Sequence, residues 1–416
     1  MKPDSVKHHL TPVGTIFLIG IIFLSTLGDE VALVAFIFKV ERASSSGLSI
    51  SMLLVAQLVP GILLSPFSGQ LIDRFETTRV LVITLILQGL LLCLLATTNK
   101  VILVLLGATI LGCLFTVSQP ALFTLLPTIV KSSTSAVAKT AWANTVLEIS
   151  QRFGSLVGTI LGGLIVARTN GISMAFIIDG VTFLIAAPVI WFSGIRRHSI
   201  DTEPSQKKKI FAGVFSGIQM LWQDSMWQDS ILRVVLPVFT AVMLASSISD
   251  VAFIFFVRQV LQGSSVTYGI LVAVWGSGIM LGALAGGSSF VERRLELFSM
   301  LGATLIGISL SLSGIFPNLI VVVVTYIAGG MANGLFNVSV RTLLHKRVLN
   351  RMYGRAFAAY FALRNVAIIT GYIIGAPFAV DSSRAVYIVS GALGTVVGIV
   401  GILAIALNTE PNKIQP

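Results

Sequence analysis

Several ionisable residues interrupt long apolar stretches of this sequence, and such residues can do chemistry that surface charges cannot. A charged side chain at the centre of a bilayer costs roughly 2.5–3.5 kcal/mol on insertion scales, so it usually pairs with an opposite charge or marks the path of a substrate or proton. We therefore treat these residues as candidates for proton coupling or for the substrate path. They are Asp29, Glu30, Glu148, Arg152, Asp179, Asp250, Arg341 and Arg364.

Asp29 is the first candidate for a proton carrier, because no basic residue lies within one helical turn of it. An acid in that position binds a proton, faces water or contacts a partner on another helix. The same alternatives hold for Asp250 and for Asp179, each of which can equally serve as a contact between helices. Glu148 and Arg152 lie four residues apart on one helix face, where they can also form an ion pair with no role in transport.

Other kinds of site find no support in the residue pattern. The sequence has no glycine-rich phosphate loop, so we do not expect ATP to drive this chain directly. It has no Cys/His spacing typical of a metal site, and its two cysteines, Cys93 and Cys113, lie within apolar runs, where they pack as small apolar residues. We expect no catalytic residues, metal or cofactor, and an intramembrane enzyme stays an alternative.

The composition indicates which elements must position these residues. Hydrophobic residues make up 55% of the 416 residues, charged residues 11%, and the mean hydropathy is +0.94. Soluble domains have about 45–50% apolar and about 25% charged residues, so a soluble enzyme, a secreted disulfide scaffold and a disordered chain are excluded. A β-barrel would alternate apolar and polar residues, whereas these apolar runs are continuous.

The apolar runs predict an all-α membrane protein with twelve transmembrane helices in two six-helix halves. We expect an N-terminal half at 1–193, a cytoplasmic linker with an amphipathic helix at 194–232, and a C-terminal half at 233–416. The predicted spans are 13–38, 48–72, 80–98, 101–126, 140–167, 171–193, 233–257, 268–290, 297–316, 318–344, 357–379 and 385–407.

The distribution of Lys and Arg predicts the orientation. The side that holds the N-terminus and every second loop carries 19 of these residues, whereas the other side carries 6, among them Lys39. By the positive-inside rule both termini are then cytoplasmic. The net charge of +11 follows from these loops, so we expect membrane lipids and no nucleic acid as partners.

The two predicted halves repeat each other in short motifs. The residues Ser25-Thr-Leu-Gly-Asp29 correspond to Ser246-Ser-Ile-Ser-Asp250 at an offset of 221 residues. A second match aligns Gly158 and Gly162 with Gly371 and Gly375 at an offset of 213 residues. Parallel repeats of this kind are a known transporter design with the substrate site near the midplane of the membrane.

Two motifs resemble those of the major facilitator superfamily. The loop after the second span contains Gly69-x-Leu-x-Asp73-Arg74 and then Arg79, and it resembles the signature loop of that family. The resemblance implies a cytoplasmic gate, to which Gly354 and Arg355 after span ten also belong. The fifth span carries a glycine face that resembles the fifth-helix antiport motif of the family's exporters, with Thr159 in place of the usual proline; its glycines are Gly154, Gly158, Gly162 and Gly163.

Further local matches resemble the macrolide-efflux and enterobactin-exporter branch of the superfamily. They are Leu27-Gly-Asp29, the stretch 178–184 and the stretch 330–345, followed by Gly354-Arg355. The resemblance implies a proton-coupled exporter of an amphipathic, drug-like or macrolide-like compound. A siderophore exporter, a lysophospholipid transporter and a non-transporting membrane sensor or scaffold stay open. We expect a monomer in a bacterial inner or plasma membrane, with a small-molecule substrate and protons as partners.

Aromatic residues in or near the spans can line a cavity for a planar substrate, but we expect most of them to face lipid. They are Phe23, Phe36, Phe123, Trp142, Tyr268, Trp275 and Tyr360.

Overall fold

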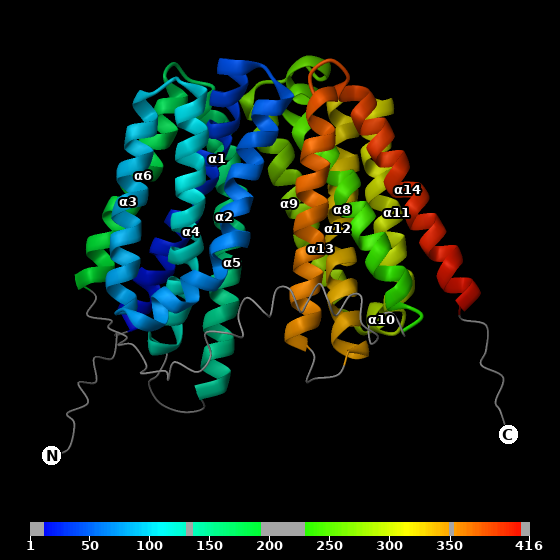
Figure 1. Cartoon of the computed structure of the whole chain (residues 1–416), viewed down its shortest axis with the longest axis horizontal. Coiled ribbons are helices and arrows are strands. Elements are labelled where there is room, and N and C mark those ends of the chain that lie inside the picture. The colour runs from blue at the N-terminus through cyan, green and yellow to red at the C-terminus, as the bar shows by residue number, and fades with distance from the viewer. Residues whose placement is uncertain (1–11, 130–135, 193–228, 349–352, 409–416) are drawn as a thin grey trace. The chain divides into compact units, whose positions relative to one another are not determined.

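The computed structural model describes residues 12–129, 136–192, 229–348 and 353–408, and these residues form helices and short turns with no strand among them. In lipid every backbone polar group must be satisfied within the chain, and a continuous apolar run therefore folds as a helix. The long helices of the first half are α1 (Pro12–Ser44), α2 (Gly47–Arg74), α3 (Thr77–Thr97), α4 (Val101–Ile129), α5 (Ala136–Val166) and α6 (Gly171–Phe192) (Figure 1).

The second half continues in the same way. Its helices are α8 (Leu232–Phe255), α9 (Ser265–Gly286), the short α10 (Ser289–Glu292), α11 (Leu295–Ile315), α12 (Leu319–Arg347), α13 (Tyr353–Gly375) and α14 (Ser383–Asn408). The helix α8 continues into a π-helical turn, η2 (Phe256–Val260), and α13 continues into a 3-10 turn, η4 (Ala376–Phe378).

These helices confirm the predicted fold class, an all-α membrane protein with twelve long helices. Eleven of the described helices are long and apolar enough to cross a membrane, and α1 adds the predicted run at 13–38. Most helix ends lie within a few residues of the predicted span ends. The largest difference is at α1, which continues to Ser44 because no glycine or proline stops it after residue 38.

The chain divides into two compact units, which we call unit 1 (Met1–Ser44 and Met52–Pro204) and unit 2 (Ser45–Ser51 and Ser205–Pro416). The first turn of α2 therefore belongs to unit 2, where the Ser51 hydroxyl donates a hydrogen bond of 2.9 Å to the Tyr372 carbonyl on α13. The predicted linker at 194–232 lies almost wholly outside the described residues, and its boundaries stay a prediction.

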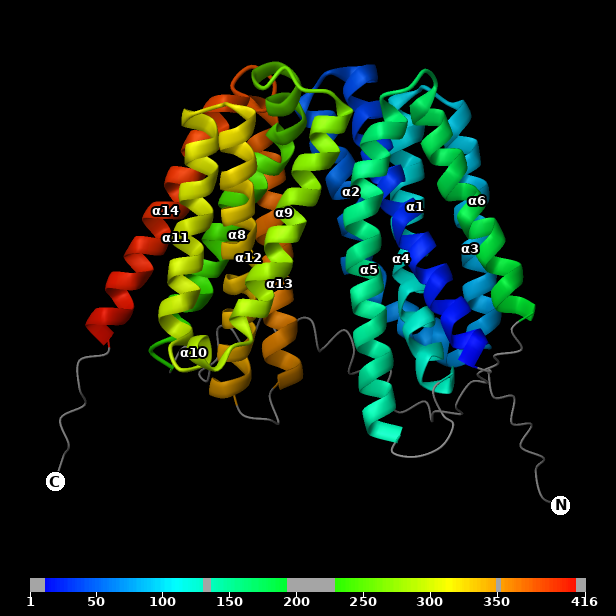
Figure 2. The same cartoon turned by 180° about the vertical axis from the view of Figure 1, so that it is seen from behind.

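The helix pairings of unit 1 recur in unit 2. In unit 1, α1 packs on α5 and α6, and α3 packs on α4 and α6 (Figures 1 and 2). In unit 2, α8 packs on α13 and α14, and α11 packs on α12 and α14. Helices α1, α3, α4, α5 and α6 thus correspond to α8, α11, α12, α13 and α14, which is the predicted parallel repeat.

The register of the repeat differs from the sequence match by one helical turn. On α5, a β-carbon at Gly154 would lie 3.0 Å from the Phe23 carbonyl oxygen of α1. On α13, a β-carbon at Gly371 would lie 2.6 Å from the Leu244 carbonyl oxygen, and Leu244 is the repeat mate of Phe23 at the offset of 221 residues. Gly371 therefore corresponds to Gly154 and not to Gly158. The evenly spaced glycines on both helices make the two matches look alike in sequence.

Candidate functional site

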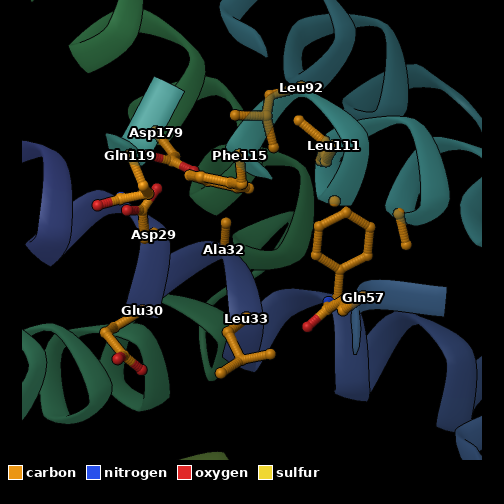
Figure 3. Close-up of a pocket in the computed structure, with 13 residues that line it drawn as sticks. Asp29, Glu30, Ala32, Leu33, Gln57, Leu92, Leu111, Phe115, Gln119 and Asp179 are labelled. Atoms are coloured by element: carbon orange, nitrogen blue, oxygen red, sulfur yellow. The ribbon is translucent and has the colours of Figure 1, made fainter. Parts of the chain in front are cut away.

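A cavity of about 330 Å³ lies within unit 1, enclosed by α1, α2, α3, α4 and α6 (Figure 3). Its lining combines carboxylates and amides with a larger set of aliphatic and aromatic side chains. An amphipathic molecule matches such a lining better than a wholly polar one does. The lining residues are Asp29, Glu30, Ala32, Leu33, Phe36, Gln57, Leu92, Ala108, Leu111, Gly112, Phe115, Gln119 and Asp179.

Two carboxylates from different helices meet in this cavity, Asp29 on α1 and Asp179 on α6. The neighbouring Gly28 makes this possible, because a β-carbon there would contact Asp179 Oδ1 and lie 3.0 Å from the Thr182 hydroxyl oxygen. The Thr182 hydroxyl donates to the Asp179 backbone carbonyl at 2.7 Å and lies 3.3 Å from Asp179 Oδ1. Asp179 is almost fully buried, with 1% of its surface exposed.

No base among the described lining residues balances this pair. Within the described part of the chain, Asp29 Oδ1 is buried and has no hydrogen-bond partner. Two like charges in a medium of low polarity repel each other strongly, and burying them without a partner is costly. A bound proton or a cationic group on a ligand would remove the imbalance. Here the structure joins two acids that the sequence analysis treated separately.

Glu30 serves a different contact from its neighbour Asp29. In Figure 3 its side chain points away from Asp29, towards α5. There the Ser155 hydroxyl donates a hydrogen bond of 2.6 Å to Glu30 Oε1. The consecutive acids of α1 thus face different neighbours, Asp29 towards Asp179 of α6 and Glu30 towards Ser155 of α5.

Lys39 is buried and does not lie in a loop, which corrects its place in the count of loop charges. Its ammonium donates a hydrogen bond of 2.7 Å to the Leu95 carbonyl near the end of α3, and it lies 5.1 Å from the centre of the Phe176 ring. Phe176 in turn meets Phe36, a cavity residue, edge to face at 4.7 Å between ring centres. The cause is the extra length of α1, which carries Lys39 between α3 and α6.

The glycines of α5 bring α1 close. A β-carbon at Gly158 would lie 2.6 Å from the Leu27 carbonyl oxygen and 2.8 Å from the Glu30 β-carbon, and one at Gly162 would lie 3.1 Å from the Val31 α-carbon. Together with Gly154 they form one continuous contact along α1. Gly163 is also buried on α5.

The remaining charged candidates lie elsewhere. On α5 the Arg152 side chain is exposed, and the side chain of Glu148 lies outside the described part. In unit 2, Asp250 on α8 is exposed, Arg341 on α12 is exposed, and Arg364 on α13 is half-buried. The cavity of unit 1 includes none of these among its described lining residues.

The predicted gate residues are placed only in part. Gly69, Asp73 and Arg74 lie in the last turns of α2, and Gly354 and Arg355 lie in the first turn of α13, but their side chains are outside the described part. The side chain of Arg79 is described, and its Nε lies 2.6 Å from Glu76 Oε2 in an ion pair at the start of α3.

Three of the seven aromatic residues singled out in the sequence lie inside the protein, and the expectation for the set as a whole stays a prediction. Phe36 lines the cavity, and Tyr268 and Tyr360 are buried in unit 2. The side chains of Phe123 and Trp142 lie outside the described part. Sequence reasoning also missed Gln57, Gln119 and Phe115 as cavity residues. The two amides could have been found from the sequence, since a glutamine within an apolar run also stands out.

The chain resembles known membrane transporters over most of its length. A family model described as Major Facilitator Superfamily matches residues 18–372. An uncharacterized MFS-type transporter of Bacillus subtilis (strain 168), YfiS, is 24% identical over 391 residues, which cover 91% of this chain and 90% of the relative.

Three solved structures show the same fold. A mutant of the nucleoside transporter NupG aligns with a TM-score of 0.76 at 12% identity and covers 94% of this chain and 99% of its own. A mutant of the peptide transporter POT aligns with a TM-score of 0.72 at 15% identity and 95% coverage of both chains. A bacterial homologue of the iron transporter ferroportin aligns with a TM-score of 0.70 at 13% identity, covering 94% of this chain and 99% of its own.

Proposed function

The chain belongs to the Major Facilitator Superfamily, and from this premise we propose that it exports an amphipathic organic compound in exchange for protons. It is a multi-pass membrane transporter of small molecules, as the family is. The observation that carries the proposal is the unbalanced Asp29–Asp179 pair in a largely apolar cavity. An acid pair that alternates between a bound proton and a bound substrate couples the two, because each occupant lowers the affinity for the other.

The lining of the cavity favours a substrate with a cationic group. Carboxylates attract a positive charge, while Phe36, Phe115 and Leu111 offer apolar and aromatic contact to the rest of the molecule. The same carboxylates would repel an anionic siderophore or the phosphate of a lysophospholipid. The resemblance to the macrolide-efflux branch supports the direction of transport.

We place the protein in a bacterial inner or plasma membrane as a monomer, with both termini in the cytoplasm. The Bacillus subtilis relative supports a bacterial source. The excess of Lys and Arg on the side of the termini supports the orientation.

A susceptibility and accumulation panel in a bacterium that lacks its own drug pumps tests the substrate class. The panel contains cationic, neutral and anionic amphipathic compounds of similar size. Expression should lower the accumulation of cationic compounds most, and a protonophore should abolish the effect. A preference for anionic compounds, or export that a protonophore leaves intact, would contradict the proposal.

Proteoliposomes loaded with the best compound of the panel test the coupling residue. The variant Asp29→Asn has nearly the same shape as a protonated aspartate but cannot ionise. It should lose transport driven by a pH gradient and keep the exchange of labelled for unlabelled compound, whereas Asp29→Glu should keep part of both. Asp250→Asn on α8 tests the repeat mate as the alternative proton carrier in the same assay. Full proton-driven export by Asp29→Asn would make this acid a structural residue.

A further inference from the structure

A second, smaller cavity of about 30 Å³ lies in unit 1 beside the first. The two cavities share Phe115 and Gln119 of α4 in their linings. Among the other residues of the small cavity, Ser25 of α1 and Ser118 of α4 are polar. One water molecule needs a cavity of about 10–15 Å³ and at least two polar partners. The small cavity is larger than this, and Ser25, Ser118 and Gln119 are available as partners.

The small cavity lies on the same side of the large one along all four helices that enclose it. On α1 its lining residue Ser25 lies one turn before Asp29, and on α6 its lining residue Phe183 lies one turn after Asp179. On α3 its lining residue Leu85 lies two turns before Leu92, which lines the large cavity. These steps lead towards the start of α1, the start of α3 and the end of α6, which is the side that the charge count places in the cytoplasm.

A buried amide on α3 lies between a residue of the small cavity and one of the large cavity along that helix. Gln88 lies on α3 between Leu85 and Leu92 and is fully buried, with 0% of its surface exposed. Its Nε2 donates a hydrogen bond of 3.3 Å to the Ser118 hydroxyl oxygen, which belongs to the lining of the small cavity. Its Oε1 is buried with no hydrogen-bond partner among the described residues. A buried acceptor of this kind is commonly satisfied by water.

We propose that the small cavity is a water site that conducts the coupling proton between the Asp29–Asp179 pair and the cytoplasmic side of unit 1. This inference rests on the proposed proton coupling. Gln119 and Ser118 orient the water, and Gln88 holds Ser118 in place.

The transfer balances without any further reactant. An O–H bond of the protonated carboxyl breaks, a new O–H bond forms on the water, and the resulting hydronium releases a different proton towards the cytoplasm. The carboxylate regains its charge, and the serine and glutamine side chains end unchanged. Water is required because the described lining of the small cavity includes no titratable side chain.

The titratable groups at the other end of this path are few. The large cavity is lined by Asp29, Glu30 and Asp179, of which Glu30 is engaged by Ser155 of α5. On α1, Lys39 is bound to the Leu95 carbonyl of α3. We take the Asp29–Asp179 pair as the start of the path, because the Glu30 side chain points away from Asp29 and contacts Ser155 of α5 (Figure 3).

The test measures how fast these carboxyls exchange protons. The purified, full-length protein in lipid nanodiscs undergoes a rapid pH jump, and time-resolved infrared difference spectroscopy records the protonated carboxyl band. The proton is the only probe, so no substrate needs to be known. In the wild type we expect a band that Asp29→Asn reduces.

Three variants alter the path without touching the acids. Gln88→Leu and Ser118→Ala remove its polar groups, and Ala186→Val adds apolar volume to the lining of the small cavity. Each should slow the carboxyl response about tenfold, the equivalent of about 1.4 kcal/mol in the barrier, with the amplitude of the band unchanged. The matched control is Thr116→Val on α4, whose hydroxyl bonds to its own helix at Gly112 and which lines neither cavity.

The outcomes separate this inference from the proposed function. A band of normal amplitude with wild-type rates in all three variants would overturn the water path and leave proton coupling standing. Absence of a titrating carboxyl band in the wild type, or a band that Asp29→Asn leaves intact, would overturn proton coupling at this pair and the path with it. Slow responses in the three variants and a normal response in Thr116→Val would support the path.

Discussion

The contact between α1 and α5 leaves no room for a β-carbon at Gly158, and Gly158→Ala tests this directly. The added atom would lie 2.6 Å from the Leu27 carbonyl oxygen, 2.8 Å from the Glu30 β-carbon and 3.1 Å from the Leu27 α-carbon. Ordinary contacts of this kind begin at 3.4 Å. Two of the three neighbours are rigid backbone atoms, so the helices themselves must separate.

The expected loss of stability follows from two opposing effects. Overpacking of this kind costs roughly 1–3 kcal/mol. Alanine is the better helix former by about 1 kcal/mol, which offsets part of the cost. We expect Gly158→Ala to lower the free energy of unfolding by about 1–2 kcal/mol. In a unit of about 200 residues each kcal/mol shifts the midpoint of thermal unfolding by roughly 2–4 °C.

The change should reach the candidate site as well as the fold. The added carbon contacts the β-carbon of Glu30. The Glu30 carboxylate accepts a hydrogen bond from Ser155, which ties α1 to α5. A displaced α1 moves the neighbouring Asp29 relative to Asp179, so we expect slower proton-driven transport in the same variant.

The assay compares thermal unfolding of the purified protein in detergent for Gly158→Ala and for a control. Gly61→Ala on α2 is matched in chemistry, but its β-carbon would have only one neighbour, the Thr116 hydroxyl oxygen at 3.9 Å. The control should be neutral or slightly stabilising. Equal midpoints for the two variants would refute the close contact and the packing role of the glycine face.

Three other expectations can be checked separately. Asp73→Asn should leave the amount of protein in the membrane unchanged and slow transport, because a gate latch acts on conformational exchange; wild-type turnover in a well-expressed variant would leave an ordinary loop. Reporters fused after residue 205, outside the described residues, and at the C-terminus should both report the cytoplasm, and an external signal from either would reverse the orientation. The hydrogen bond from Lys346, and then its charge, lower the pKa of Glu292, with 2.8 Å between Lys346 Nζ and Glu292 Oε1. The small stabilisation of the folded state by this exposed pair is therefore fully present above the usual pKa of a glutamate, and it is lost as the pH falls through the lowered pKa of Glu292. Thermal unfolding measured against pH should lack this dependence in Glu292→Gln.

Helix positions were predictable because each depends on a local property of the chain. An apolar run long enough to cross the bilayer must be helical wherever it lies, and only the exact ends depend on neighbours, as Ser44 at the end of α1 illustrates. The candidate acids were predictable for a similar reason, since a carboxyl in an apolar run stands out without any knowledge of its partners.

Pairings between helices could not be read from the chain in the same way. Asp29 and Asp179 are 150 residues apart, and they meet because Gly28 leaves space for the carboxyl of α6. The glycine spacing on α5 indicated a close contact but not its register, which depends on where the carbonyl groups of α1 lie. Lys39 shows the same dependence, since its burial follows from helices that begin at residues 77 and 171.

The position of Lys39 has a consequence for biogenesis. Its partners, the Leu95 carbonyl and the Phe176 ring, are synthesised after α1. An unpaired lysine near the end of an inserted helix can extend its ammonium to the lipid headgroups. We therefore expect Lys39 to enter the bilayer as an interfacial residue and to leave the headgroups when α3 and α6 pack against it. On this view, burial of the Lys39 ammonium would report the packing of α3 and α6 against α1.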